Sequence, residues 1–165
     1  MKKAEIVKAR QDASPTPIGL PSNLDLDLND VIGIKARRIS KLTSALFAEL
    51  SEQQEVTALQ MGVLIGIGQA GIISVSDLAR RLWIDRSTLQ ELLTRLLKKG
   101  IVARRTSAVD RRVHEVWLTE IGIETVQALL PAAKLVQFHV LAGLPDHQIS
   151  ELFGMLDRIL ERSRD

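Results

Sequence analysis

The sequence predicts a mainly helical fold with one small β-hairpin, and three observations carry this prediction. Apolar residues make up 45% of the 165 residues but aromatic residues only 3%, so the core must consist mostly of Leu, Ile, Val and Ala. From about residue 29 onward, most apolar positions recur at helical spacing. Two short segments of alternating polarity, 101–105 and 113–118, interrupt this pattern and flank a polar loop, as the strands of a hairpin do.

The first 23 residues are predicted to form a flexible N-terminal arm, because proline, glycine and serine disfavour a regular element there. Leu24, Leu26 and Leu28 then alternate with acidic residues. This alternation fits either a short strand or an apolar arm that packs on a partner. From about residue 29 to residue 50 the apolar spacing is helical and predicts the first long helix.

A second helix is predicted to begin at Thr57, since Thr57 and Gln60 have the spacing of a capping box, and to end near Gly71. An alternative is a dinucleotide-binding loop of the G-x-G-x-x-G type, with Glu91 binding the ribose. Its glycines are Gly66, Gly68 and Gly71. The context disfavours it, because the capping box begins a helix where the loop needs a strand, and the unit occurs only once.

A short helix over 76–82 follows an extended link at 73–75. Asp85 is the predicted N-cap of the next helix, 86–99, and Gly100 its C′ residue. An unbroken apolar stripe on that helix consists of Leu89, Leu92, Leu93, Leu96 and Leu97. The short helix, the tight turn and the amphipathic helix, followed by a basic hairpin, describe a winged helix-turn-helix.

Two further helices are predicted after the hairpin. Thr119 caps the first, which extends to about Leu141 and should be kinked by Pro131. The second follows the turn at 143–145 and is expected to bury Ile149, Leu152, Phe153, Leu156, Ile159 and Leu160.

The positive charge is concentrated in one segment. Between residues 76 and 112 there are ten basic and four acidic residues, a formal charge of +6, so the rest of the chain carries −4. Such a segment is what a phosphate-binding surface requires, although a solvated helix face has the same composition.

The predicted helix 86–99 presents a polar face opposite its leucines, and its first turns would meet the base edges in a major groove. The candidates for base contact are Arg86, Ser87, Thr88 and Gln90. The candidates for contact further along the helix or with phosphate are Thr94, Arg95, Lys98 and Ser76. In the hairpin loop, Arg111 and Arg112 are placed to enter a minor groove or to straddle phosphates, and Asp110 to bind loop amides or an arginine.

Several other classes of function are excluded or disfavoured. The absence of cysteine excludes disulfides, thiolate nucleophiles and Cys-based zinc sites. His147 and Glu151, with His139 or His114 nearby, have the spacing of metal ligands, but chance also produces it on a solvated helix. No G-x-S-x-G elbow of a hydrolase is present. No apolar run reaches the length of a membrane span. We therefore expect a cytoplasmic protein, not an enzyme, without cofactor or metal.

These motifs resemble the MarR family of transcriptional regulators over about residues 29–162. The resemblance is carried by Ser76-Asp77-Leu78-Ala79, Ile84-Asp85-Arg86-Ser87-Thr88, Leu96-Leu97-Lys98-Lys99-Gly100-Ile101-Val102, Asp110-Arg111-Arg112 and Leu118-Thr119-Glu120-Ile121-Gly122. It implies a homodimer that binds pseudo-palindromic duplex DNA. Its parts would be the arm 1–23, a dimerisation helix in 24–56, the winged helix-turn-helix 57–119 and C-terminal dimerisation helices in 120–165.

The resemblance also implies that Asp110 and Arg112 form the family's Asp-x-Arg pair, with the arginine in the minor groove. Family members are often repressors released by a small anionic aromatic ligand, for which Arg37, Arg38 and His139 are the candidate pocket residues here. Glu91 stands where many members carry an arginine, which predicts an atypical operator. The remaining alternative is a winged helix that only binds proteins, and salt dependence distinguishes it from a DNA-binding one.

Overall fold

The computed structural model describes residues 27–51 and 55–161, in two compact units, Met1–Lys35 and Ala36–Asp165. The predicted arm 1–23, together with Leu24 and Leu26, lies outside the described residues. In the first unit, Leu28 begins a 3-10 turn, η1 (Leu28–Asp30), whose cap is the Asp27 side chain. The first long helix, α2 (Ile32–Leu50), starts after this turn, slightly later than predicted.

The second unit holds the remaining helices, as the sequence predicts. They are α3 (Ala58–Ala70), α4 (Val75–Leu82), α5 (Arg86–Lys98), α6 (Glu120–Leu141) and α7 (Asp146–Glu161). The predicted caps are confirmed: Thr57 and Gln60 form a reciprocal capping box, and Asp85 caps α5. Thr119 caps α6 and also donates a hydrogen bond to the Gly100 carbonyl at 2.6 Å. These caps satisfy amide groups that every helix start leaves unpaired.

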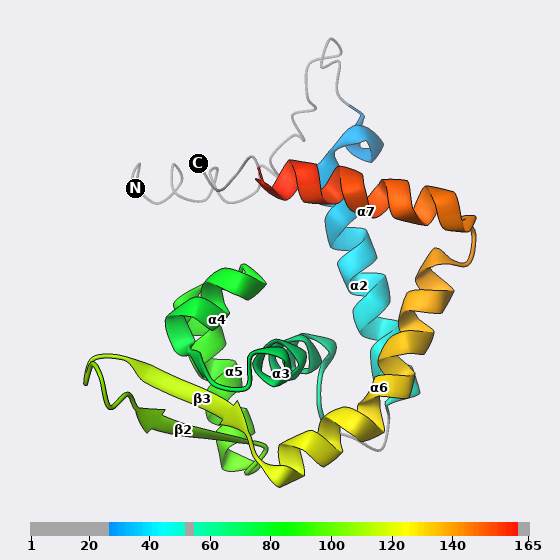
Figure 1. Ribbon diagram of the computed structural model, residues 1–165. Coiled ribbons are helices and arrows are strands. Elements are labelled where there is room, and N and C mark those ends of the chain that lie inside the picture. Colours follow the sequence, from blue (N-terminus) through cyan, green and yellow to red (C-terminus); the bar gives the residue numbers. More distant parts are fainter. Residues whose placement is uncertain (1–26, 52–54, 162–165) are drawn as a thin grey trace, which may run out of the picture. The chain divides into compact units, whose positions relative to one another are not determined.

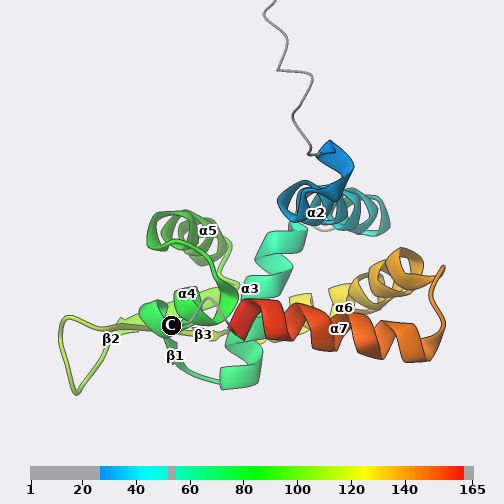
Figure 2. The ribbon, with the colours of Figure 1, turned by 90° about the horizontal axis from the view of Figure 1, so that it is seen from above.

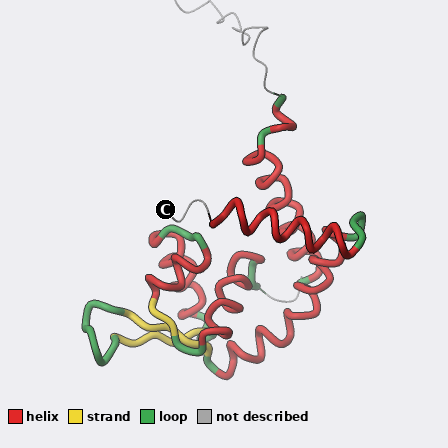
Figure 3. The backbone as a smooth tube through the Cα atoms, turned by 45° about the horizontal axis from the view of Figure 1, so that its top comes forward, coloured by secondary structure: helices red, strands yellow, loops and turns green. Residues whose placement is uncertain are grey.

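Three antiparallel strands form a small sheet in the order β1-β3-β2. They are β1 (Ile73–Ser74), β2 (Val102–Thr106) and β3 (His114–Leu118). In the hairpin, Val102 lies opposite Leu118 and Thr106 opposite His114. The loop that joins β2 to β3 projects away from helices α3 to α5 in three views (Figures 1, 2 and 3). We call β2, β3 and this loop the wing.

The core of the second unit lies around α3, which packs against α4, α6 and β3. Its fully buried side chains include Met61, Leu64, Ile67, Leu78, Leu89, Leu93, Leu96 and Val116. Of the predicted leucine stripe of α5, Leu89, Leu93 and Leu96 are buried, and Leu92 and Leu97 are partly buried. The stripe thus attaches α5 to the core and leaves its opposite face outward.

The dinucleotide-binding alternative is wrong. Gly66 and Gly68 lie inside α3, and Gly71 is the C-cap of this helix, with φ of 74°. The two internal glycines instead allow close packing, because a Cβ on Gly66 would meet Leu78 at 3.2 Å and one on Gly68 would meet Leu118 at 3.2 Å. No strand precedes them among the described residues, so a phosphate loop has no place here.

The expectation that α7 buries its apolar residues is wrong for the single chain, because no residue of α7 is buried. Its exposed hydrophobic side chains are Phe153, Met155, Leu156, Ile159 and Leu160. Helix α6 continues through Pro131, and its ribbon bends between the yellow and orange parts (Figure 1). No single described helix is long and apolar enough to span a membrane; α6 and α7 together meet that test by length and composition alone, with a 99° bend between them.

Candidate nucleic-acid interface

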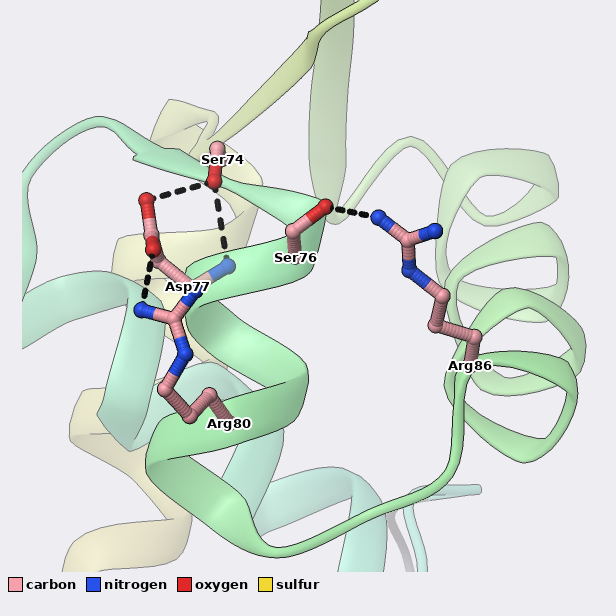
Figure 4. A network of polar contacts seen from close by, with 5 residues as sticks. All are labelled: Ser74, Ser76, Asp77, Arg80 and Arg86. Carbon is pink, nitrogen blue, oxygen red and sulfur yellow. Dashed lines mark hydrogen bonds and ion pairs between the residues drawn. The ribbon is translucent and has the colours of Figure 1, made fainter.

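Helix α4 begins one residue earlier than predicted, and Ser74, not Ser76, lies at its N-cap. The Ser74 hydroxyl accepts a hydrogen bond from the Asp77 amide at 3.0 Å and donates one to the Asp77 carboxylate at 2.6 Å (Figure 4). This second bond lowers the pKa of Asp77, which also forms an ion pair with Arg80 at 2.8 Å. Ser76 lies inside the first turn, where its hydroxyl accepts a hydrogen bond from the Arg86 guanidinium. Ser76 therefore links α4 to the start of α5.

The N-terminus of α5 is organised around Asp85. One carboxylate oxygen accepts hydrogen bonds from the Thr88 amide at 2.8 Å and from the Ser87 hydroxyl at 2.5 Å. The other accepts one from the Thr88 hydroxyl at 2.6 Å. These bonds, the Ser87 one first, hold the pKa of Asp85 well below its ordinary value. The two hydroxyls predicted to contact bases are thus turned toward the cap in the free protein.

Gln90 is half-buried on the outward side of α5. Its side-chain oxygen accepts a weak hydrogen bond, 3.4 Å long, from Arg104 on β2, and its backbone carbonyl accepts one from the Thr94 hydroxyl at 2.7 Å. Further along the same helix, Arg95 and Lys98 are exposed, as is Glu91. The face predicted to meet DNA is therefore outward, and its charged side chains are basic except for Glu91.

Asp110 gives the loop of the wing its shape, as predicted. Its carboxylate accepts hydrogen bonds from the backbone amide of Arg112 at 2.9 Å and from its Nε at 3.2 Å, which lowers the pKa of Asp110. The Asp110 carbonyl accepts a further bond from the Val113 amide at 2.9 Å, and the Ser107 amide closes the loop on the Val113 carbonyl at 2.8 Å. The Arg112 side chain stays 91% exposed despite its ion pair, and Arg111 beside it is exposed too.

The strands of the wing are braced across the hairpin near its loop. Arg105 and Glu115 lie opposite each other and form an ion pair at 2.8 Å, which lowers the pKa of Glu115. The Arg105 guanidinium also lies 5.5 Å from the centre of the Trp117 ring. Such cross-strand contacts stabilise a hairpin, so the loop is presented on a braced support.

One hollow of about 380 Å³ brings the candidates from three elements together. It lies among the start of α4, the start of α5 and the wing. The predicted residues that line it are Ser76, Arg86, Ser87, Gln90 and Arg112. Thr94, Arg95 and Lys98 continue the same helix beyond it, and Thr88 is half-buried against its cap. Two guanidiniums, two serine hydroxyls and the amide of Gln90 thus converge on one outward surface.

The sequence interpretation missed two residues of this region. His114, the first residue of β3, lines the same hollow. Arg104 reaches Gln90 across the space between β2 and α5. The register of the hairpin would have predicted both positions, because it places Arg104 opposite Val116 and His114 opposite Thr106. This register depends on which residues form the loop.

The remaining candidates are the residues predicted for a ligand pocket and for a metal site. Arg37 and Arg38 are exposed on α2, and His139 is exposed on α6, where its Nδ1 lies 2.9 Å from the Leu135 carbonyl oxygen. No group of three or more metal-ligating side chains occurs in the described part of the chain, so His147 and Glu151 gain no third donor from the other histidines there.

Comparisons with known proteins agree with this geometry. The MarR family matches residues 56–114 of the chain. The HTH-type transcriptional repressor MdtR of Bacillus subtilis is 30% identical over 101 residues, which cover 61% of this chain and 65% of that protein, slightly less than two thirds of it. YfiV, an uncharacterized HTH-type transcriptional regulator of the same organism, is 31% identical over 128 residues, which cover 74% of this chain and 80% of that protein.

The likeness extends to solved structures. A mutant of MarR from E. coli, complexed with operator DNA, matches with a TM-score of 0.73 and 26% identity, over 82% of this chain and 99% of that one. The match thus reaches well beyond the winged helix-turn-helix to the helices that flank it. The chain belongs to the MarR family of winged helix-turn-helix transcriptional regulators, a family of regulators and not of enzymes.

Proposed function

We propose that this protein is a cytoplasmic homodimer that binds a pseudo-palindromic operator, represses transcription, and is released from DNA by a small anionic ligand. Helix α5 enters the major groove and the wing lies along the adjacent minor groove. Two subunits then read half-sites about one helical turn apart. The parts of the chain act as the sequence suggests, with the winged helix-turn-helix in 57–119 and the dimerisation helices in 24–56 and 120–165.

The observation that carries the proposal is the hollow shared by α4, α5 and the wing. A phosphate or a base edge at this surface would meet the guanidiniums of Arg86 and Arg112, the hydroxyl of Ser87, and the amide of Gln90. Guanidiniums bind phosphate through two parallel hydrogen bonds, and the glutamine amide suits adenine. The formal charge of +6 over residues 76–112 attracts the same polyanion from a distance.

The exposed apolar surfaces of the flanking helices support a homodimer. Phe153, Leu156 and Leu160 are exposed on α7, and Phe138 is 68% exposed on α6. Several large apolar side chains on neighbouring turns are costly to leave in water, and a second copy of the chain would cover them. A dimer also supplies the two recognition helices that a palindromic site needs.

The test is selection of binding sequences from a pool of random duplexes by the purified protein at near-physiological salt. We expect enrichment of a pseudo-palindrome whose half-sites are about one helical turn apart. The logarithm of the affinity for the selected duplex should fall linearly with the logarithm of salt concentration. Arg112→Ala should reduce this slope, and Arg37→Ala, on α2, serves as a matched control that leaves it unchanged.

Failure of a folded dimer to enrich any sequence would contradict the sequence-specific part of the proposal. Tight but unselective binding with the same steep salt dependence would leave a general DNA-binding protein. Binding of neither kind would favour a winged helix that associates with other proteins. Such apolar association, unlike phosphate binding, would be insensitive to salt.

A further inference from the structure

His114, the first residue of β3, is a titratable side chain within the surface proposed to meet DNA. It is half-buried and lines the hollow of about 380 Å³ that α4, α5 and the wing share. Histidine is the side chain whose charge ordinarily changes between pH 5 and 8, whereas arginine stays charged throughout this range. Among the described residues that line the hollow, His114 is therefore the one whose charge can change near neutral pH.

Two further charged side chains line the hollow, and both are cations. Arg86 enters from α5 and Arg112 from the loop of the wing. Helix α4 contributes only uncharged side chains to the lining, and the neighbouring strand β2 places the uncharged Thr106 opposite His114. Helices α3 and α6 also contact β3 but add no residue to the lining. A positive charge on His114 would thus have no counter-ion among the described residues of the hollow.

The carboxylates closest to the hollow along the chain are held by other partners. Glu115 follows His114, but side chains alternate along a strand, and the hydrogen bond and ion pair with Arg105 lower the pKa of Glu115. The hydrogen bonds described above also lower the pKa values of Asp85 and Asp110. These three carboxylates stay ionised near neutral pH. A change of pH around 7 therefore alters the charge of this surface at His114 and not at them.

We propose that His114 binds a phosphate of the operator in its protonated form, beside Arg86 and Arg112, so that DNA binding takes up a proton at this residue. The inference rests on the function proposed above. A protonated imidazole donates from both ring nitrogens, whereas a neutral one donates from only one. A hydrogen bond from a charged donor to phosphate is about twice as strong as a neutral one. The operator therefore selects the protonated side chain.

The direction of the effect follows from the charges in the hollow. A bound phosphate supplies the counter-ion that the lining residues do not provide. Protonation of His114 thus strengthens operator binding, and operator binding favours protonation by the same factor. The affinity should increase as the pH falls. Because each subunit of a dimer contributes one wing, two protons at most accompany the binding of one operator.

The test is the affinity of the full chain for the selected operator between pH 6 and pH 8 at constant ionic strength. If phosphate favours the protonated form about tenfold in each subunit, the affinity should rise by about tenfold or more from pH 8 to pH 6. His114→Gln stays neutral, so it should match wild type at pH 8 within about twofold and lose most of the rise. His114→Lys stays charged, so it should bind tightly and almost equally at both pH values.

The chain offers two matched controls for the substitution. His139 and His147 are its other histidines, and both are exposed on helices away from the hollow. His139→Gln and His147→Gln should each keep the full pH dependence of wild type. This comparison separates protonation in the wing from protonation in the proposed dimerisation helices.

Isothermal titration measures the proton directly. The heat of operator binding at pH 7, compared between two buffers of different ionisation enthalpy, gives the number of protons taken up. Wild type should take up a measurable fraction of a proton per subunit, and His114→Gln and His114→Lys should take up much less. Wild type is informative by itself here, so the test does not depend on how well a variant folds.

Three results would overturn the inference: an operator affinity of wild type that is the same at pH 6 and pH 8, a full pH dependence that remains in folded His114→Gln, or its loss in His139→Gln or His147→Gln. Each of these leaves the proposed function intact, because the operator is still bound. A protein that binds no duplex at any pH would instead contradict the proposed function, and the inference with it.

Discussion

The hydroxyl of Ser76 accepts a hydrogen bond from the guanidinium of Arg86, and this contact joins the first turn of α4 to the first turn of α5. Ser76 was a candidate for direct contact with phosphate, but its place beside Arg86 assigns it a different role. We infer that it positions the arginine for DNA. The loss of one such hydrogen bond changes a free energy by about 1 kcal/mol, which is a factor of about five in affinity.

We therefore predict that Ser76→Ala weakens operator binding about fivefold and that Ser76→Thr, which keeps the hydroxyl, has a smaller effect. The measurement is a double-mutant cycle with Arg86→Ala, read as operator affinity. If Ser76 acts through Arg86, its removal should cost little once Arg86 is absent. A full fivefold loss in both backgrounds would show that Ser76 contacts DNA on its own.

Arg112→Ala should weaken binding to all sequences by similar factors, because a wing arginine at the backbone or in the minor groove reads little sequence. The slope of log affinity against log salt should decrease by about 1, the value for one lost phosphate contact. Asp110→Asn should have a smaller effect in the same direction, since it loosens the loop without removing the guanidinium. An unchanged slope for Arg112→Ala would exclude the wing from the interface.

Gln90→Ala should have the opposite signature, a changed base preference with an unchanged salt slope. The side chain is neutral, and a glutamine that pairs with adenine contributes about 1–3 kcal/mol of discrimination. Repeating the selection with the variant measures this directly. Glu91→Gln is the matched comparison on the next residue, where removal of a negative charge should raise affinity for every sequence. The same selected sequence for wild type and Gln90→Ala would remove Gln90 from base recognition.

The elements that sequence reasoning placed correctly are those determined by local contacts. Thr57 with Gln60, Asp85 and Thr119 each cap a helix within three residues of themselves, so their spacing is readable from the sequence alone. The same holds for Asp110, whose partner Arg112 is two residues away. The N-cap role of Ser74 was missed because Ser76, two residues later, has the same side chain. In the structure it is the Ser74 hydroxyl that accepts a hydrogen bond from the backbone amide of Asp77.

The features that were missed depend on contacts between distant segments or between chains. The bond between Gln90 and Arg104 spans 14 residues and requires the hairpin register. Helix α4 ends at Trp83 in a left-handed conformation, which a sequence without a glycine at this position does not reveal. The exposure of α7 was missed because an amphipathic helix has the same pattern whether its apolar face meets its own core or another chain.

The stability contributed by Asp85 should depend on pH in a defined direction. Its pKa is held below the ordinary value of 3.8, so the folded state favours the carboxylate more than the unfolded state does. The contribution is therefore complete above about pH 4 and is lost as the pH falls through the lower, folded value. Asp85→Ser keeps an N-cap hydroxyl but cannot ionise.

Urea denaturation of wild type and Asp85→Ser at neutral and acid pH measures this contribution. The difference between their free energies of unfolding should be constant near neutral pH and should shrink below about pH 4. Thr57→Ser is the control, because neither threonine nor serine titrates in this range. The difference in free energy of unfolding between Thr57→Ser and wild type should therefore not change with pH. A difference for Asp85→Ser that stays constant down to pH 2 would contradict the assignment.

The exposed face of α7 predicts how the dimer can be broken. Phe153, Leu156 and Leu160 lie within two turns of one helix face, and Glu151 lies nearly opposite by helical periodicity. If a second chain covers the apolar face, Leu156→Asp would bury an unpaired charge there and should dissociate the dimer.

Sedimentation equilibrium should then give the mass of a single 18.3 kDa chain, whereas wild type and Glu151→Gln should give twice that mass. The monomer should keep its helical circular dichroism but bind the palindromic operator far more weakly, because each half-site would be bound independently. A dimeric Leu156→Asp with normal operator affinity would move the dimer interface away from α7.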